Sequence, residues 1–260
     1  MNIKKKFWII SVVCLALLFG STPTHAASDT SSIFKIQAYS YNTISETYQL
    51  EQYGSAVLVA KDILLTNAHV ITDNDDKFTL QYEACRTISS SESPVCFSTL
   101  QVLSYDKNTD LALLKIVTPN DAMPDPVTLW SGTLAIGAAI SIVGYPANGG
   151  ESITTTQGTI AWYEQWYYKT DANIDGGNSG GGGFDNAGNF IWIPTFVVNG
   201  QTTLGYLIPI DIIKEFLAGD IGTTSTQRVA ATFTKRLETQ YGLVDQKNIT
   251  NTLFTTPAFS

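Results

Sequence analysis

Three residues of this chain have the side chains and the neighbours that nucleophilic acyl transfer requires. His69 stands in the phrase TNAHV, Asp110 opens the phrase DLALLKI, and Ser179 lies in the phrase GNSGG. A serine hydroxyl attacks a carbonyl only when a neighbouring base removes its proton, and imidazole performs this role near neutral pH. A carboxylate on the second ring nitrogen orients the imidazole and stabilises its protonated form. Together the three residues predict a Ser-His-Asp catalytic unit.

Each residue also has an ordinary structural explanation. His69 is compatible with a histidine at the end of a strand, Asp110 with a turn before a buried strand, and Ser179 with a flexible glycine loop. The coincidence of all three contexts in one chain argues against these separate explanations. The only other histidine is His25, near the N-terminus, so acid–base chemistry by imidazole depends on His69.

The N-terminal segment has the composition of a secretory signal peptide. Lysines at 4–6 precede an apolar run from Phe7 to Phe19, and a short cleavage site ends at Ala26. The apolar run is short for a membrane span, which makes an uncleaved anchor the weaker alternative. We therefore expect residues 1–26 to be removed. The mature protein is then secreted or periplasmic and has no membrane partner.

The charge of the chain excludes one class of partner. The formal net charge is −8, and loss of the three lysines of the leader makes it −11. A protein that binds nucleic acid displaces counterions from phosphates with clustered lysines and arginines, and this sequence has no such cluster. We expect no nucleic-acid partner.

Two cysteines remain after the leader, Cys85 and Cys96. Export to an oxidising compartment favours a disulfide between them over a pair of free thiols, and metal binding is weaker still without neighbouring histidines. An acidic loop at Asp73, Asp75 and Asp76 fits a solvated turn better than a calcium site. We expect neither a metal nor a cofactor.

The spacing of apolar residues indicates an all-β fold. Short apolar or alternating runs, separated by Gly, Pro, Asn and Asp, recur from Ile33 to Tyr206, which is typical of a barrel or a sandwich. The expected strands after residue 54 are 55–60, 63–66, 78–82, 95–103, 111–117, 127–130, 138–143, 153–162, 166–170, 190–193 and 204–208. Residues 27–53 are either a removable segment or contain the first strand.

The spacing of apolar residues changes after Pro209. Asp211 is placed to cap a short helix over 212–217, and an apolar residue at every fourth position from Val229 to Tyr241 predicts a second helix. We therefore divide the chain into a signal peptide (1–26), a first half with His69 and Asp110 (27–120), a second half with Ser179 (121–210), and C-terminal helices and tail (211–260).

The three phrases resemble those of chymotrypsin-fold serine proteases, and their wording is most similar to the HtrA/Deg-type bacterial trypsin-like peptidases. The resemblance extends from Gly54 to Ile210 and includes the phrases GYP at 144–146 and YLIPI at 206–210. It implies two six-stranded antiparallel β-barrels with the catalytic residues between them. It also implies that the backbone N–H groups of Gly177 and Ser179 form the oxyanion hole.

The resemblance also places the substrate pocket. It implies that Asn173, six residues before the serine, lies at the base of the pocket, and that Thr195 and Tyr206 line it. Because residue 173 is not acidic, we expect a small or apolar residue before the cleaved bond, rather than Arg or Lys. The expected partner is a peptide or protein substrate; the oligomeric state is not predicted.

Two positions and the length of the C-terminal segment depart from the family pattern. Asn178 replaces the aspartate that pairs with a new N-terminus in animal trypsins, so that activation switch is not expected. Gly182 replaces a usual proline and completes a run of four glycines, which predicts a looser segment after the nucleophile. The residues after Ile210 are too few for a PDZ domain, so we expect none.

The sequence thus predicts a secreted serine endopeptidase that works through an acyl-enzyme intermediate. Two alternatives from other classes remain. One is a catalytically silent pseudoprotease that acts as a binding module, and the other is an exported esterase with the same triad.

Overall fold

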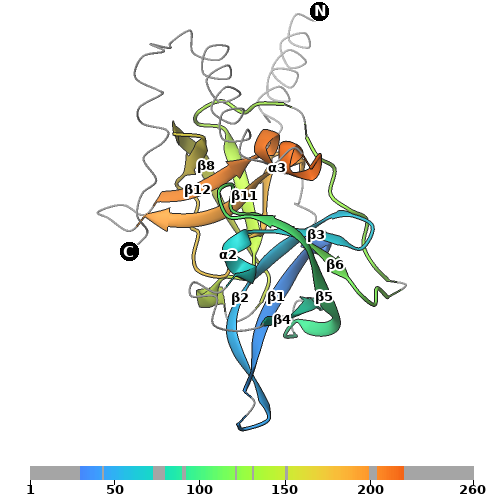
Figure 1. Ribbon diagram of the computed structural model, residues 1–260. Coiled ribbons are helices and arrows are strands. Elements are labelled where there is room, and N and C mark those ends of the chain that lie inside the picture. Colours follow the sequence, from blue (N-terminus) through green and yellow to red (C-terminus); the bar gives the residue numbers. More distant parts are fainter. Residues whose placement is uncertain are drawn as a thin grey trace, which may run out of the picture.

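The computed structural model describes most of the chain between residues 30 and 219. The described ranges are 30–42, 44–72, 80–89, 92–120, 122–130, 132–149, 152–198 and 204–219. Within them the chain forms two closed barrels of six antiparallel strands each, lower and upper in Figure 1. The predicted fold class is therefore confirmed. The expected signal peptide, the helix expected over 229–241 and the acidic loop at 73–76 lie outside the described residues.

The N-terminal barrel contains strands β1 to β6 in the order β1-β2-β3-β6-β5-β4. Its strands are β1 (Ile33–Asn42), β2 (Thr47–Ala60), β3 (Ile63–Thr66), β4 (Leu80–Arg86), β5 (Val95–Asp106) and β6 (Leu111–Ile116). A 3₁₀ turn, η1 (Thr30–Ser32), precedes β1, and one helical turn, α2 (Ala68–Ile71), follows β3. Residues 33–42 therefore form the first strand of the barrel, paired with both β2 and β4.

The C-terminal barrel contains strands β7 to β12 in the order β10-β11-β12-β9-β8-β7. Its strands are β7 (Ala139–Gly144), β8 (Thr154–Glu164), β9 (Tyr167–Thr170), β10 (Gly182–Asp185), β11 (Phe190–Val198) and β12 (Leu204–Pro209), with a 3₁₀ turn, η2 (Ala147–Gly149), after β7. Counted from its own first strand, each barrel has the order 1-2-3-6-5-4. The two halves of the chain thus share one topology.

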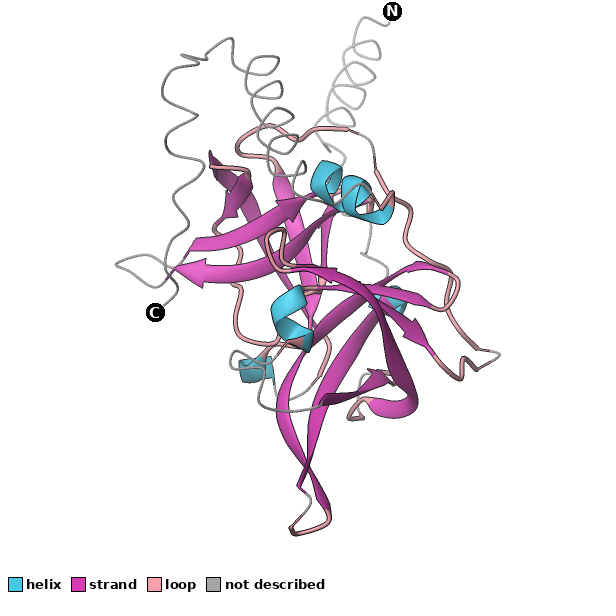
Figure 2. Cartoon of the chain, in the orientation of Figure 1, coloured by secondary structure: helices cyan, strands magenta, loops and turns pink. Residues whose placement is uncertain are grey.

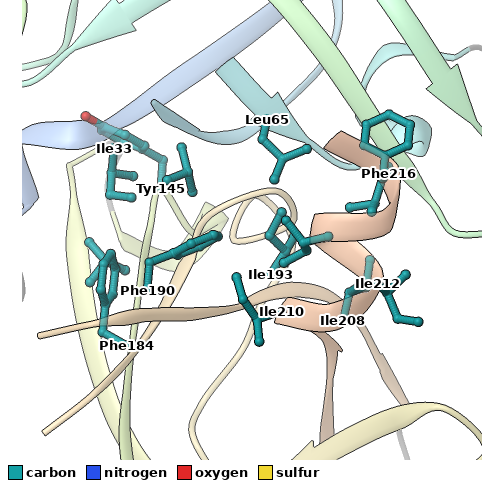
Figure 3. Packing of buried hydrophobic residues seen from close by; sticks show 14 residues of the cluster. Ile33, Leu65, Tyr145, Phe184, Phe190, Ile193, Ile208, Ile210, Ile212 and Phe216 are labelled. Carbon is teal, nitrogen blue, oxygen red and sulfur yellow. The ribbon is translucent and has the colours of Figure 1, made fainter. Parts of the chain in front are cut away.

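A cluster of buried apolar residues joins the barrels. Ile33 and Leu65 come from the N-terminal barrel, Phe184 and Ile193 come from the C-terminal barrel, and all four are at most 1% exposed. Figure 3 shows these side chains packed together with residues of α3 (Ile210–Leu217). Burial of apolar surface between the barrels contributes about 25 cal/mol per Å². This packing fixes the position of one barrel relative to the other.

In the part of the chain that the structure describes, helices are few and short (Figure 2). Among the described residues, no helix has the length and the apolar character that crossing a membrane requires. The helix predicted over 212–217 begins earlier, at Ile210, because Pro209 occupies the N-cap position with extended backbone angles. Asp211 therefore lies in the first turn and is not the cap. Its negative charge still suits the positive end of the helix dipole.

One predicted strand and one predicted loose segment were wrong. Residues 127–130 form no strand and make an isolated bridge between Leu129 and Phe190. The glycine run, expected to be loose, instead enters strand β10, which pairs with β7 and β11. A side chain at Gly183 would lie 3.1 Å from Cβ of Trp192, so glycine permits close packing here and not flexibility.

The disulfide predicted between Cys85 and Cys96 is present. The two residues face each other on β4 and β5 and are 11 residues apart in the sequence. The bond closes the β4–β5 connection next to Thr87, which contacts the C-terminal barrel through the hydroxyl of Tyr145.

We expect replacement of both cysteines by alanine to lower the free energy of unfolding by about 2 to 3 kcal/mol, because an unfolded chain without the bond has more conformations. Urea denaturation of the two proteins measures the difference. The wild-type protein in reducing buffer is the control and should show a similar loss. A difference below about 0.5 kcal/mol would contradict this prediction.

Candidate active site

Pairing of β3 with β6 brings His69 and Asp110 together. The strands are antiparallel, with Thr66 opposite Ala112. The end of β3 and the beginning of β6 therefore lie at the same edge of the barrel. His69 follows β3 in α2, and Asp110 directly precedes β6. Two residues that are 41 positions apart in the sequence thus become neighbours.

The carboxylate of Asp110 holds both the ring and the backbone of His69. Nδ1 of His69 lies 2.8 Å from Oδ2 of Asp110, and the His69 N–H donates to Oδ1 at 3.0 Å. A carboxylate only accepts hydrogen bonds, so Nδ1 carries the proton and Nε2 of the neutral ring keeps its lone pair. The His69 side chain is 46% exposed and that of Asp110 is 19% exposed. The free ring nitrogen therefore belongs to a solvent-accessible imidazole.

Asn67 fixes the backbone of Asp110. Its side-chain nitrogen, Nδ2, donates to the carbonyl of Asp110 at 2.8 Å, and Asn67 is completely buried. Asp110 has a φ of 55°, in the left-handed region that aspartate tolerates better than most residues. The bond from Asn67 supports this unusual conformation, which directs the carboxylate toward His69.

Thr195 joins the carboxylate to the serine. The register of β11 against β12 shifts between Pro194 and Phe196, which leaves Thr195 in a bulge. A bulge redirects a side chain out of the ladder. The Thr195 hydroxyl donates to Oδ2 of Asp110 at 2.5 Å, and the Thr195 carbonyl accepts from Oγ of Ser179 at 2.8 Å. Thr195, predicted as a pocket residue, thus contacts two of the three predicted catalytic residues.

The hydroxyl of Ser179 points to Thr195 in this structure. Among the described residues, no hydrogen bond joins it to His69, so His69 and Asp110 are in direct contact and Ser179 reaches them through Thr195. Hydrogen bonds between a nucleophile and its base are often loose without substrate. Rotation about the Cα–Cβ bond of Ser179 moves its hydroxyl between staggered positions.

The peptide groups around Ser179 have an alternating pattern of hydrogen bonds. The carbonyls of Gly176 and Asn178 accept from the N–H groups of Ala147 and Gly181, at 2.6 and 2.9 Å. The described peptide bonds are trans, so the N–H of each peptide points away from its carbonyl. Within the described residues, the N–H groups of Gly177 and Ser179 have no protein acceptor. These are the two groups predicted to form the oxyanion hole.

Glycine is required in this turn. Gly177 has a φ of 92° and Gly180 a φ of 82°. A Cβ at Gly177 would lie 2.3 Å from the carbonyl oxygen of Tyr145, and a Cβ at Gly180 would lie 2.2 Å from that of Ser55. Both the backbone angles and the surrounding atoms therefore exclude larger residues.

The other two predicted pocket residues lie in different surroundings. Asn173 is exposed, and its carbonyl accepts from the hydroxyl of Thr156. Tyr206 is 8% exposed, stacks on Phe196 with ring centres 4.4 Å apart, and donates its hydroxyl to Glu164. Aromatic rings therefore follow Thr195 along β11 and its partner strand.

Tyr167 extends this aromatic group toward the carboxylate. Its ring packs edge-on against Phe196 and Tyr206, with centres 5.1 and 5.9 Å away. Burial, together with the nearby negative charge of Asp110, raises the pKa of Tyr167. Tyr167 therefore stays neutral at physiological pH and adds no charge next to Asp110.

Sequence reasoning missed the hydrogen bonds that support the site. Asn67 binds the carbonyl of Asp110, and Ser55 joins the carbonyl of Gly177 to the N–H of Tyr145. Asn67 is a polar residue directly before the histidine segment, and Ser55 is a lone hydroxyl at the start of an apolar strand. Polar residues in otherwise apolar runs are signals of buried hydrogen bonds. Tyr145 gave no such signal, because a tyrosine in a β protein is ordinarily part of the core.

Comparison with known proteins agrees with this geometry. Residues 54–191, more than half of the chain, match the trypsin-like peptidase domain. The fold is a pair of antiparallel barrels of the chymotrypsin type, and the chain belongs to the trypsin-like peptidase family.

The chain is similar to several HtrA and Deg proteases. It is 29% identical over 201 residues to the serine endoprotease DegS of Haemophilus influenzae, over 70% of this chain and 54% of DegS. It is 30% identical over 181 residues to the mitochondrial Protease Do-like 4 of Arabidopsis thaliana, over 65% of this chain and 32% of the relative. The chain thus spans about a third to a half of the length of these curated relatives.

A solved structure with a similar fold is that of the serine endoprotease from Yersinia pestis. The TM-score is 0.59 and the sequence identity 25%, and the match covers 77% of this chain and 66% of that one.

We expect Gly180→Ala to be far more damaging than Gly137→Ala. Gly137 has nearly the same φ, 81°, but no atom lies within 4 Å of a Cβ built there. Gly137→Ala should lower the free energy of unfolding by about 1 to 2 kcal/mol through backbone strain alone. Gly180→Ala should lower it by a further ~1 to 3 kcal/mol through overpacking.

Urea denaturation of both variants measures this difference. Equal losses for the two would show that the contact of Gly180 with Ser55 is not tight.

Proposed function

We propose that this protein is a secreted serine endopeptidase that cleaves peptide bonds through Ser179, His69 and Asp110. The observation that carries the proposal is the contact of His69 Nδ1 with Asp110, at 2.8 Å, beside a turn with two unpaired N–H groups. Acyl transfer by a serine needs a base with a fixed tautomer to take the serine proton and donors to bind the oxyanion. Membership of the trypsin-like peptidase family supports the same reaction class.

In the proposed reaction, the Ser179 hydroxyl leaves the Thr195 carbonyl and donates to Nε2 of His69. Oγ then attacks the substrate carbonyl carbon as His69 takes the proton, and the N–H groups of Gly177 and Ser179 bind the resulting oxyanion. Collapse of this intermediate breaks the C–N bond, and His69 returns the proton to the leaving amine. Water repeats the sequence on the acyl-enzyme. Each oxyanion donor contributes about 10²- to 10³-fold to the rate.

A fluorophosphonate probe tests this proposal, because Oγ of an activated serine displaces fluoride from its phosphorus. We expect the mature protein to be labelled and Ser179→Ala not to be. His69→Ala should lower peptide turnover by about 10⁴-fold or more, since no other histidine of the mature chain substitutes for it. Circular dichroism and the thermal midpoint of each variant control for folding.

The outcomes separate the proposal from its two alternatives. A folded protein that no probe labels is a pseudoprotease. A labelled protein that hydrolyses esters but cleaves no member of an unbiased peptide library is an esterase.

We further propose a preference for a small or apolar residue before the cleaved bond. Support comes from Asn173, which carries no charge, and from the aromatic rings of Phe196 and Tyr206 next to Thr195. A lysine or arginine needs an acidic partner when it is removed from water.

Peptide-library profiling should therefore show enrichment of residues such as alanine, valine or leucine at this position, with no enrichment of arginine or lysine. A trypsin-like profile would disprove this pocket assignment.

The proposed export of the protein has its own test. N-terminal sequencing of the protein from the culture medium or periplasm should give a sequence that begins at Ala27.

A further inference from the structure

Ser55 of β2 connects the N-terminal barrel to the turn that carries the nucleophile. It is completely buried. Its N–H donates to the carbonyl of Ser179 at 2.8 Å, and its hydroxyl donates to the carbonyl of Gly177 at 2.6 Å. The hydroxyl oxygen also accepts from the N–H of Tyr145 at 2.9 Å. Three hydrogen bonds from one residue therefore join it to the other barrel.

These bonds act on the peptide groups next to the oxyanion donors. The carbonyls held by Ser55 belong to the peptides 177–178 and 179–180, on either side of the peptide that carries the Ser179 N–H. The N–H groups of those two peptides are also bonded, to the carbonyls of Asp175 and Pro194. A peptide plane turns as a unit. Fixing the planes on both sides therefore limits rotation of the peptide between them.

The hydroxyl of Ser55 has little freedom to move. A Cβ built on Gly144 would lie 2.9 Å from it, so the space beside the hydroxyl is already filled by the backbone of β7. Tyr145 is in turn held at its far end, where its phenol oxygen lies 3.0 Å from the hydroxyl of Thr87. The donor that binds Gly177 is thus held in one position by both barrels.

We propose that Ser55 is a positioning residue that aims the N–H groups of Gly177 and Ser179 at the developing oxyanion. The inference rests on the proposed function and adds to it a requirement on the N-terminal barrel. Ser55 touches neither the substrate nor the reacting atoms. It acts through the turn, and its loss changes the direction of the two donors without removing them.

A matched control distinguishes positioning from ordinary stability. Ser32 is also a buried serine, 1% exposed, and its hydroxyl donates to the carbonyl of Asp125 at 2.7 Å. Ser32→Ala therefore removes the same kind of hydrogen bond without a contact to residues 177–180. Both alanine variants should unfold at a lower urea concentration than the wild type. The shift should be larger for Ser55→Ala, because the Ser55 hydroxyl makes two hydrogen bonds and that of Ser32 makes one.

The experiment compares kinetics and the binding of two inhibitors. We expect Ser55→Ala to lower kcat by about 10- to 100-fold, less than complete loss of a donor, with KM changed by less than about threefold. Ser32→Ala should leave both constants near the wild-type values.

The inhibitors are a peptide ending in leucinal and the corresponding peptide ending in leucinol. With the aldehyde, Ser179 Oγ forms a bond to the carbonyl carbon, the π electrons move to oxygen, and the serine proton passes to His69. The alcohol forms no such adduct. Ser55→Ala should weaken aldehyde binding about as much as it lowers kcat, with alcohol binding unchanged.

An unchanged ratio of aldehyde to alcohol affinity in Ser55→Ala would overturn the inference, because a purely structural residue would behave like Ser32. If the alanine variant does not fold, Ser55→Cys gives the same test with a weak donor in place of the hydroxyl, and wild-type kcat in that variant would also overturn it. A wild-type protein that neither cleaves peptides nor binds the aldehyde more tightly than the alcohol would sink the proposed function itself.

Discussion

The contact between the two barrels is the interaction on which the candidate site depends. His69 and Asp110 belong to one barrel and Ser179 and Thr195 to the other, so neither barrel contains the site alone. The apolar cluster of Figure 3 supplies a large but non-directional attraction between them. The hydrogen bonds of Ser55 and Thr195 supply direction, because they form only at one relative position of the barrels. The first interaction holds the halves together, and the second determines their alignment.

The need for directional hydrogen bonds explains why polar groups are buried at the boundary between the two barrels. Ser55 is completely buried and Thr195 is 2% exposed, and both make hydrogen bonds to the other barrel. A buried polar group costs free energy unless it has a partner, so a displacement of one barrel would leave several groups unpaired at once. The boundary is therefore more sensitive to small displacements than an apolar contact would be. Accurate placement of atoms within the turn at 177–180 is a direct result.

The alternating apolar runs were sufficient to predict an all-β fold, because they are local signals. The three polar phrases pointed to the candidate catalytic residues, and their resemblance to those of a known family implied the two barrels. Other features depend on contacts between distant residues. Gly182 and Gly183 have no side chains to show a strand period, so the packing of Trp192 against β10 was invisible. Residues 127–130 are as apolar as a strand, but the ladders of both barrels are already complete without them. The role of Thr195 depends on a bulge, which no pattern of residue types indicates.

The shared strand order gives the placement of the candidate residues a simple description. In each barrel, the connection between the third and fourth strands contains one member of the pair that would exchange a proton: His69 between β3 and β4, and Ser179 between β9 and β10. The two halves therefore resemble the subunits of a dimer in which equivalent loops meet at a common boundary. In such an arrangement, the base and the nucleophile come from equivalent positions. One type of strand connection, used once in each barrel, supplies both.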